Sequence, residues 1–247
     1  MIPAAAPAWL PYCGAAPVPA DWLGRWNFDP VLLVALTGIA VVAWRKTDAA
    51  GRPLMASAIA LSVLLFVSPF CALSSALFSA RVTHHVLLAA VLAPVLVFAV
   101  RDDQIRWPGS LAMWTGLQAI TFWLWHSPGL YVEALSSNLL YWVMQVTLLG
   151  TAMGFWAALR RASAPAAIAA LLASTVQMGL LGALITFAET PLYRPHFFTT
   201  QPWGFNALED QQLAGLIMWA PSAGLYLGAA MVLVHRWLAR EERELAL

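Results

Sequence analysis

Charged residues are scarce in this chain: Asp, Glu, Lys and Arg make up 10% of its 247 residues, whereas 61% are hydrophobic. A soluble domain carries about 25% charged residues, because its surface must interact with water. The composition therefore excludes an ordinary soluble domain and predicts an integral membrane protein held in a lipid bilayer. The net charge is only +1 and there is no basic block, so nothing indicates nucleic-acid binding.

The sequence also lacks the short motifs of common enzymes. It has no phosphate-binding G-x-x-x-x-G-K-[ST], no G-x-S-x-G, no H-E-x-x-H and no C-x-x-C. There are only two cysteines, Cys13 and Cys71, and neither lies in a motif, so no disulfide framework or zinc site is predicted. We therefore expect no enzymatic activity.

Long apolar runs dominate what is present. A helix needs about 20 apolar residues to cross the roughly 30 Å hydrocarbon core of a bilayer. Seven segments approach this length, and they predict an all-α bundle of seven transmembrane helices. The segments are 29–45, 53–75, 82–100, 109–127, 138–159, 165–187 and 211–235. We expect three regions: an N-terminal tail (1–28), which is disordered or loosely packed, a transmembrane domain (29–238) and a cytoplasmic C-terminal tail (239–247).

Prolines mark two positions along these segments. Asp29 precedes Pro30, which is a good N-cap followed by proline in the first helical turn. Ser68 and Pro69 interrupt the second segment, where we expect a kink.

The distribution of basic residues orients the bundle. Cytoplasmic connections of membrane proteins are enriched in Lys and Arg. One set of connections holds ten of the 13 basic residues: Arg45, Lys46, Arg52, Arg101, Arg106, Arg160, Arg161, Arg236, Arg240 and Arg243. The opposite set holds Arg25, Arg81 and Arg194. The N-terminus is therefore predicted outside and the C-terminus in the cytoplasm.

Four of the five histidines fall on the predicted outer side. His84 and His85 open the third span, His126 ends the fourth, and His196 lies in the loop before the seventh. Neutral imidazole is a common ligand for copper, zinc and haem iron. Adjacent helical residues point about 100° apart, so His84 and His85 are not expected to bind one ion as a pair.

Other polar and sulfur-containing side chains are predicted near these histidines. Thioether sulfur suits Cu(I), and amides or carboxylates orient metal-bound imidazoles. Candidates for such contacts, or for contacts with a partner, are Gln177, Met178, Glu189, Asp210 and Gln211. Arg81 shares a helix face with His85, because the two are four residues apart.

Several stretches resemble one known family. They are FSARVTHHVLLAAVLAPVL at 78–96, WLWHSPGLY at 123–131, GALITFAETPLYRP at 182–195 and LEDQQLAGLIMWAPSAGLYL at 208–227. With WNFDPVLL at 26–33 and RWLAREE at 236–242, they are similar to the CtaG-type cytochrome c oxidase assembly factors, which are polytopic bacterial membrane proteins. Family members typically begin the third span with His-x-x-x-His. Here the second histidine matches His85, and Arg81 stands at the first position.

The resemblance implies a biogenesis factor for a haem–copper respiratory oxidase in the bacterial inner membrane, whose partners are oxidase subunits. We expect His85 and His126 to hold copper, with His84 or His196 completing the site. Two alternatives remain open at this point. One is a metal-free scaffold or accessory subunit in which Arg81 pairs with a carboxylate such as Glu189 or Asp210, with a partner or with a lipid phosphate. The other is a haem-binding protein with His85 and His126 as axial ligands.

Overall fold

The computed structural model describes residues 11–100 and 107–245, which form an all-helical fold with no strand in these ranges. The helices are α1 (Pro30–Lys46), α2 (Arg52–Phe66), α3 (Pro69–Ala76), α4 (Phe78–Leu87), α5 (Ala93–Ala99), α6 (Leu111–Trp125), α7 (Pro128–Ser136), α8 (Asn138–Arg161), α9 (Ala164–Thr186) and α10 (Ala207–Leu245). A π-helical turn (Leu88–Leu92) joins α4 to α5, and short 3-10 turns cover Trp22–Gly24, Arg194–His196 and Gln201–Trp203.

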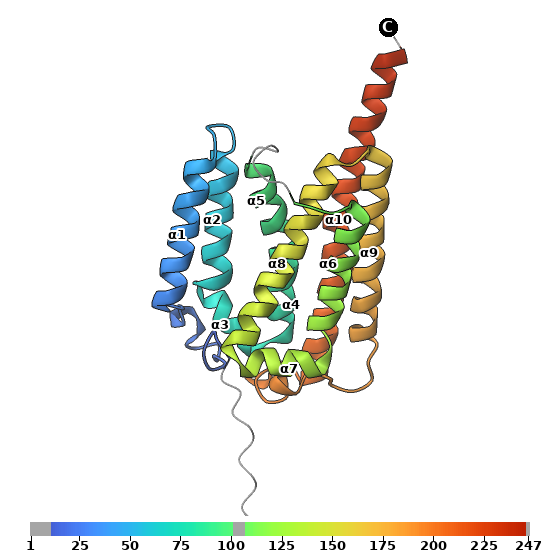
Figure 1. The fold of residues 1–247 in the computed structure, drawn as a ribbon. Coiled ribbons are helices and arrows are strands. Elements are labelled where there is room, and N and C mark those ends of the chain that lie inside the picture. The colour runs from blue at the N-terminus through green and yellow to red at the C-terminus, as the bar shows by residue number, and fades with distance from the viewer. Residues whose placement is uncertain (1–10, 101–106, 246–247) are drawn as a thin grey trace, which may run out of the picture.

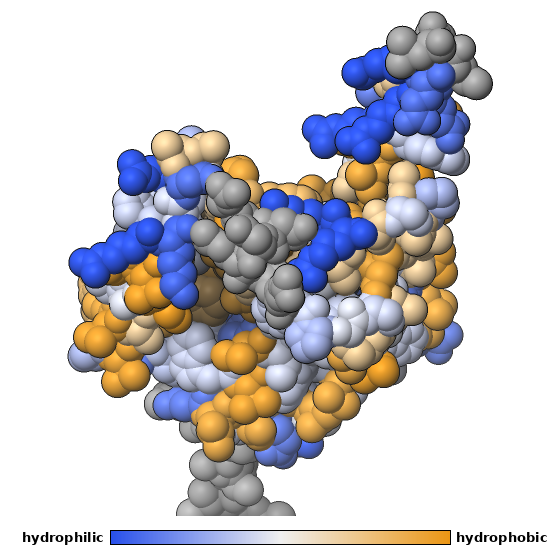
Figure 2. All heavy atoms as spheres, turned by 45° about the horizontal axis from the view of Figure 1, so that its top comes forward, coloured by the Kyte–Doolittle hydropathy of each residue, from blue (hydrophilic) through white to orange (hydrophobic). Residues whose placement is uncertain are grey.

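The long helices stand side by side and define two ends of the molecule (Figure 1). The short helices α3 and α7 and the connection between α9 and α10 lie at one end, which we call the α7 end. At the opposite end, α10 extends beyond the other helices. Figure 2 shows hydrophilic residues gathered at that opposite end and on the protruding part of α10, with hydrophobic residues on the flank below.

Helix length and composition confirm part of the predicted membrane topology. Four helical stretches within the described ranges are long and apolar enough to cross a bilayer: Phe78–Ala99, Asn138–Arg161, Ala164–Thr186 and Ala207–Glu244. A fifth crossing exists if the bent pair α2 and α3 counts as one span. Helices α1 and α6 lie where two further spans are predicted, but they have only 17 and 15 residues.

Prolines shape the helices as the sequence predicts. The side chain of Asp29 accepts a hydrogen bond from the Val31 backbone N at 2.8 Å and so caps α1. At Ser68–Pro69 the chain bends by 44° between α2 and α3, which confirms the predicted kink. Ser68 then caps α3 by accepting a bond from the Phe70 backbone N at 3.2 Å.

The π-helical turn was not predicted, although Pro94 accounts for it. Proline has no backbone N–H and clashes with the carbonyl of residue i−4, here Ala90, so a regular α-helix cannot continue through this turn. The backbone N–H of Ala93 instead bonds to the carbonyl of Leu88, five residues earlier. Trp156 of α8 donates to the carbonyl of Ala89 at 2.9 Å and fixes the widened turn against the bundle. Such turns often lie at functional sites, and this one directly follows His84 and His85.

Helices α9 and α10 approach closely because two glycines face each other. A Cβ on Gly182 would lie 2.7 Å from the carbonyl oxygen of Gly215, and a Cβ on Gly215 would lie 2.2 Å from the Oγ1 of Thr186. Small residues commonly permit such close contacts between membrane helices, and this one draws the start of α10 against the end of α9.

Replacing Gly215 with alanine is therefore expected to destabilise the protein. The new methyl group meets backbone that cannot move without separating α9 from α10, at a cost of about 1–3 kcal/mol in the free energy of unfolding. Gly228→Ala in the same helix is the matched control, because its Cβ would meet nothing within 4 Å. Thermal unfolding followed by circular dichroism measures the difference. Equal unfolding midpoints for the two variants would contradict the close contact.

The predicted N-terminal tail needs correction in residues 11–28, whereas residues 1–10 lie outside the described ranges. Residues 11–28 are not a loose tail: Cys13 forms a disulfide with Cys71, and the Tyr12 hydroxyl donates to the Asp29 carboxylate at 2.5 Å. The Tyr12 ring also stacks on Tyr141 with 5.0 Å between ring centroids. The apolar, proline-rich composition could not reveal these contacts, because they join segments far apart in sequence. The predicted C-terminal tail is helical through Leu245, as a continuation of α10.

Loss of this disulfide is expected to lower stability. It closes a separation of 58 residues, and removing a cross-link of this kind costs about 2–4 kcal/mol, mainly by freeing the unfolded chain. The double variant Cys13→Ala/Cys71→Ala should unfold at the same lower temperature with or without reductant. The unfolding midpoint of the wild-type protein should drop to that temperature only when reductant is added. A wild-type midpoint that does not change with reductant would contradict the prediction.

Candidate functional site

The structure brings two of the predicted histidines into direct contact. The Nδ1 atom of His85 in α4 lies 3.3 Å from the Nε2 atom of His126, which follows α6 directly. Their rings meet edge to face with 5.2 Å between centroids. Both side chains are fully shielded, with exposed fractions of 0% and 2%. The helices α4 and α6, which the sequence alone leaves separate, are thus joined by an imidazole pair at the α7 end.

Hydrogen bonding defines which nitrogens of this pair are free. The carbonyl oxygen of Phe122 lies 2.7 Å from Nδ1 of His126, and a carbonyl can only accept, so Nδ1 carries the proton. The Nε2 lone pair of His126 therefore points at His85. The other ring nitrogen of His85, Nε2, is buried without a hydrogen-bond partner. The lone pair of His126 thus accepts from the Nδ1–H group of His85, which leaves a second lone pair on Nε2 of His85.

The other two histidines have different neighbours. His84 donates from Nε2 to the carbonyl of Leu65 at 3.1 Å, and its ring lies against Phe66 and Phe70. This arrangement confirms that His84 and His85 point in different directions.

His196 is held by hydrogen bonds on both ring nitrogens. Its Nδ1 donates to the carbonyl of Ala76 at 3.2 Å, and its Nε2 accepts from the Tyr131 hydroxyl at 2.7 Å. Burial lowers the pKa of His196 to about 3, so its imidazole is neutral. Across residues 11–100 and 107–245, no group of three or more His, Cys, Asp or Glu side chains is arranged to hold a metal ion. His85 and His126 stay the predicted ligands.

Arg81 lies one helical turn before His85 and is fully buried. None of its three guanidinium nitrogens has a hydrogen-bond partner among the described residues. The guanidinium carbon lies 5.3 Å from the centre of the Tyr141 ring, over its face. The predicted pairing of Arg81 with Glu189 or Asp210 is not formed, because Glu189 is exposed to solvent and Asp210 is engaged elsewhere.

Asp210 caps the helix that carries Arg81 and His85. Its carboxylate accepts hydrogen bonds from the backbone N–H groups of Phe78 and Ser79, at 2.6 and 3.2 Å, and from the Ser79 hydroxyl. A negative charge at a helix N-terminus is favoured by the helix dipole. The contact joins the first turn of α10 to the first turn of α4 and so fixes how far α4 enters the bundle.

The remaining predicted residues have structural contacts or lie apart. Gln211 accepts from the Leu192 backbone N at 2.7 Å and donates to the carbonyl of Ile185 at 3.3 Å, so it holds the loop after α9. Met178 is buried in the main hydrophobic core. Gln177 is half-buried, and its Oε1 has no hydrogen-bond partner.

Three buried polar residues of α7 and α8 were missed by the sequence analysis. Tyr131 in α7 and Tyr141 in α8 flank the guanidinium, and their rings are fully buried. Gln145, one turn after Tyr141, is buried with neither side-chain atom hydrogen-bonded. No motif marks them, because they come together only through the packing of α4, α7 and α8.

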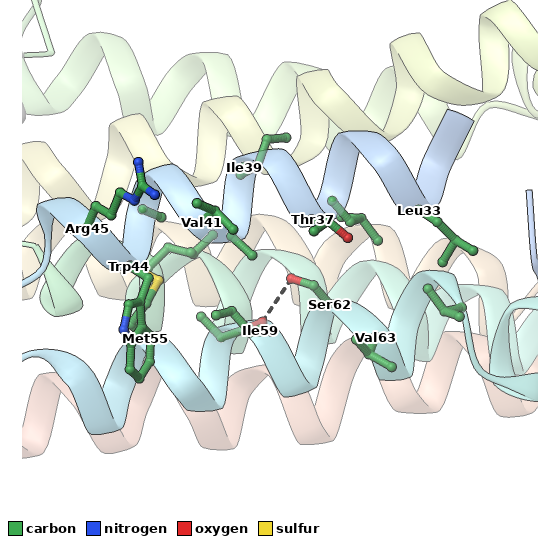
Figure 3. A pocket seen from close by; sticks show the side chains of 16 residues that line it. Leu33, Thr37, Ile39, Val41, Trp44, Arg45, Met55, Ile59, Ser62 and Val63 are labelled. Atoms are coloured by element: carbon green, nitrogen blue, oxygen red, sulfur yellow. Dashed lines mark hydrogen bonds between the residues drawn. The ribbon is translucent and has the colours of Figure 1, made fainter. Parts of the chain in front are cut away.

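A separate pocket lies between α1 and α2, away from the histidines (Figure 3). Its volume is about 630 Å³, and Leu96 of α5 contributes to the lining. The walls are apolar apart from Arg45 at one end and two hydroxyl side chains, of which Ser62 donates to the carbonyl of Ala58 at 2.8 Å. Apart from the thioether of Met55, this pocket offers none of the predicted kinds of metal ligand, and it is not the predicted site.

Comparison with known proteins assigns the chain to a family. Residues 101–240 match the model of the cytochrome c oxidase caa3 assembly factors. This range is more than half of the chain and includes His126, His196 and Asp210, whereas Arg81 and His85 precede it. No curated protein and no solved structure matches the chain significantly. The family match confirms the resemblance seen in the sequence, and the chain belongs to the cytochrome c oxidase caa3 assembly factor family.

Proposed function

We propose that this protein supports the maturation of a haem–copper oxidase by holding one Cu(I) ion between His85 and His126 before transfer to an oxidase subunit. The observation that carries the proposal is the buried imidazole pair, with nitrogen atoms 3.3 Å apart. A buried pair from two different helices is an expensive arrangement unless it serves a ligand, since polar groups in a membrane bundle are rare and functional by default.

The geometry of the pair suits a soft ion with few ligands. Metal–imidazole distances are about 2.0 Å, so an ion in line between the two nitrogens needs them about 4 Å apart. A shift of under about 1 Å would open the pair to that distance. The proton of His85 would then sit on Nε2, and the Phe122 carbonyl would orient His126, as outer partners of metal-bound imidazoles commonly do.

The proposed topology has seven spans, with the N-terminus outside and the α7 end on the periplasmic face of a bacterial inner membrane. Two features support this orientation. Eight of the ten basic residues on the predicted cytoplasmic side belong to α1, α2, α8 or α10 at the ends away from α7, and Arg101 and Arg106 lie outside the described residues. The disulfide Cys13–Cys71 lies at the α7 end, and such bonds persist in oxidising compartments such as the periplasm.

A metal-free scaffold is the second candidate, and one observation favours it. The buried guanidinium of Arg81, one turn from His85, repels any cation placed there. The haem alternative has less support, because nitrogen atoms 3.3 Å apart leave no space for a porphyrin between the rings.

The decisive experiment deletes the gene for this protein in its host and complements the deletion with the wild type or with variants. Deletion should lower the amount of assembled haem–copper oxidase, and the wild-type protein should restore it. His85→Ala/His126→Ala should restore oxidase subunits that lack copper if the protein delivers the metal. Full restoration of a copper-loaded oxidase by this variant would instead support the scaffold, and normal oxidase levels after deletion would refute both candidates.

A further inference from the structure

Arg81 is the largest side chain that is completely buried, and its charge has no counter-charge in contact. A guanidinium stays protonated in proteins, so it cannot escape burial by losing its proton. Its five N–H donors need acceptors, because a buried charge without hydrogen bonds is strongly unfavourable. The ring face of Tyr141 supplies some attraction, and the neutral hydroxyls of Tyr131 and Tyr141 lie close to the guanidinium, but none of these groups brings a negative charge.

Each acidic residue at the α7 end either contacts a group other than Arg81 or is exposed to solvent. Asp21 pairs with Arg25, Asp29 accepts from Tyr12, Glu209 accepts from the Asn206 backbone N, Asp210 caps α4, and Glu133 and Glu189 are exposed. No carboxylate among the described residues is therefore available to Arg81. The residues that the structure describes therefore supply no counter-charge to Arg81.

The surroundings of Arg81 consist of neutral groups with unused hydrogen-bonding capacity. Helices α4 and α8 run in the same direction from the α7 end (Figure 1). Because Arg81 meets Tyr141, the residues one turn further along each helix, His85 and Gln145, lie at a common depth. Both carry buried polar atoms without partners, namely Nε2 of His85 and the side-chain amide of Gln145. An anion beside Arg81 would find N–H donors in this layer from the side-chain amide of Gln145.

We propose that Arg81 anchors a binding site for one small monovalent anion, of halide or formate size, at the α7 end of the bundle. One charge suffices, since the guanidinium carries one and the flanking groups are neutral. A small ion is required because Arg81, Tyr131, Tyr141 and His85 are all completely enclosed. Where the proposed copper function holds, the anion also removes the repulsion between Arg81 and a cation at His85.

The test uses the purified, metal-free full-length protein in detergent at constant ionic strength. Chloride replaces gluconate, an anion too bulky for an enclosed site, while the thermal unfolding midpoint and the ³⁵Cl NMR line width are followed. We expect both to change with chloride and to saturate as for a single site. Arg81→Gln should weaken the apparent chloride affinity at least tenfold, Arg81→Lys should keep a reduced response, and Arg25→Gln should respond like the wild type, since Arg25 forms an exposed ion pair.

Two results would overturn the anion site. One is a wild-type protein without a saturable chloride response, which would mean that water alone satisfies the guanidinium. The other is an Arg81→Gln variant that keeps the wild-type affinity, which would place the chloride elsewhere. Should Arg81→Gln fail to fold, the wild-type titration and Arg81→Lys still decide the outcome. Because no copper is present, the result is independent of whether the protein carries the metal.

Discussion

His85→Ala/His126→Ala is expected to abolish Cu(I) binding by the purified protein. The wild type should bind about one ion, because the imidazole pair provides two nitrogen donors at a fully buried position. Each single variant leaves one imidazole, which cannot compete with a strong chelator, so we expect an affinity loss of at least about 100-fold, the upper range for changes around metal ligands. Competition titration with a coloured Cu(I) chelator measures the effect.

His84→Ala is the matched control for the copper measurement. His84 is the neighbour of His85 in sequence and equally buried, but its ring nitrogen is bonded to the Leu65 carbonyl and points away from the pair. It should retain the wild-type copper affinity. If His84→Ala lost copper as completely as His126→Ala, the assignment of the pair would be incorrect. An unchanged copper stoichiometry in His85→Ala/His126→Ala would show that the pair does not bind copper.

Asp210→Ala is expected to be the most destabilising single substitution in the predicted site, at about 3–5 kcal/mol in the free energy of unfolding. The change leaves the backbone N–H groups of Phe78 and Ser79 buried without acceptors, and each such group costs about 1–3 kcal/mol. It also removes the negative charge at the start of α4. Denaturation followed by circular dichroism gives the magnitude.

Two further variants separate the charge of Asp210 from its hydrogen bonds. Asp210→Asn keeps one oxygen acceptor and should lose only part of the stability. Glu209→Ala, next in the same helix turn, removes an exposed cap that accepts from the Asn206 backbone N, and it should cost only about 1 kcal/mol. Equal losses for Asp210→Ala and Glu209→Ala would show that burial of the Asp210 contact contributes little.

Local chemistry made much of the fold predictable. Apolar runs predicted the positions of the four helical stretches that are long enough to cross a bilayer, because each helix satisfies its own backbone within an apolar segment. The cap at Asp29 and the kink at Pro69 followed from rules that need only neighbouring residues. The helical period also separated His84 from His85 before any contact was known.

Rules that use only neighbouring residues do not predict contacts between segments that are distant in sequence. The disulfide Cys13–Cys71 joins a proline-rich segment to α3, and no spacing of two cysteines specifies a bond. The widened turn after Leu87 needed both Pro94 and Trp156, and only the proline is local. Helix α7 was missed because its nine residues are too few for a span.

The sequence by itself determined that this is an all-helical membrane protein of the assembly-factor family, with histidines gathered toward one end. Only the tertiary structure decided which of them meet. His85 faces His126 while His84 and His196 bond to backbone and tyrosine, and Arg81 faces Tyr141 rather than an acid. The physical reason is that composition and period set the face of each helix, whereas the partner across the bundle depends on how α4, α6 and α8 pack together.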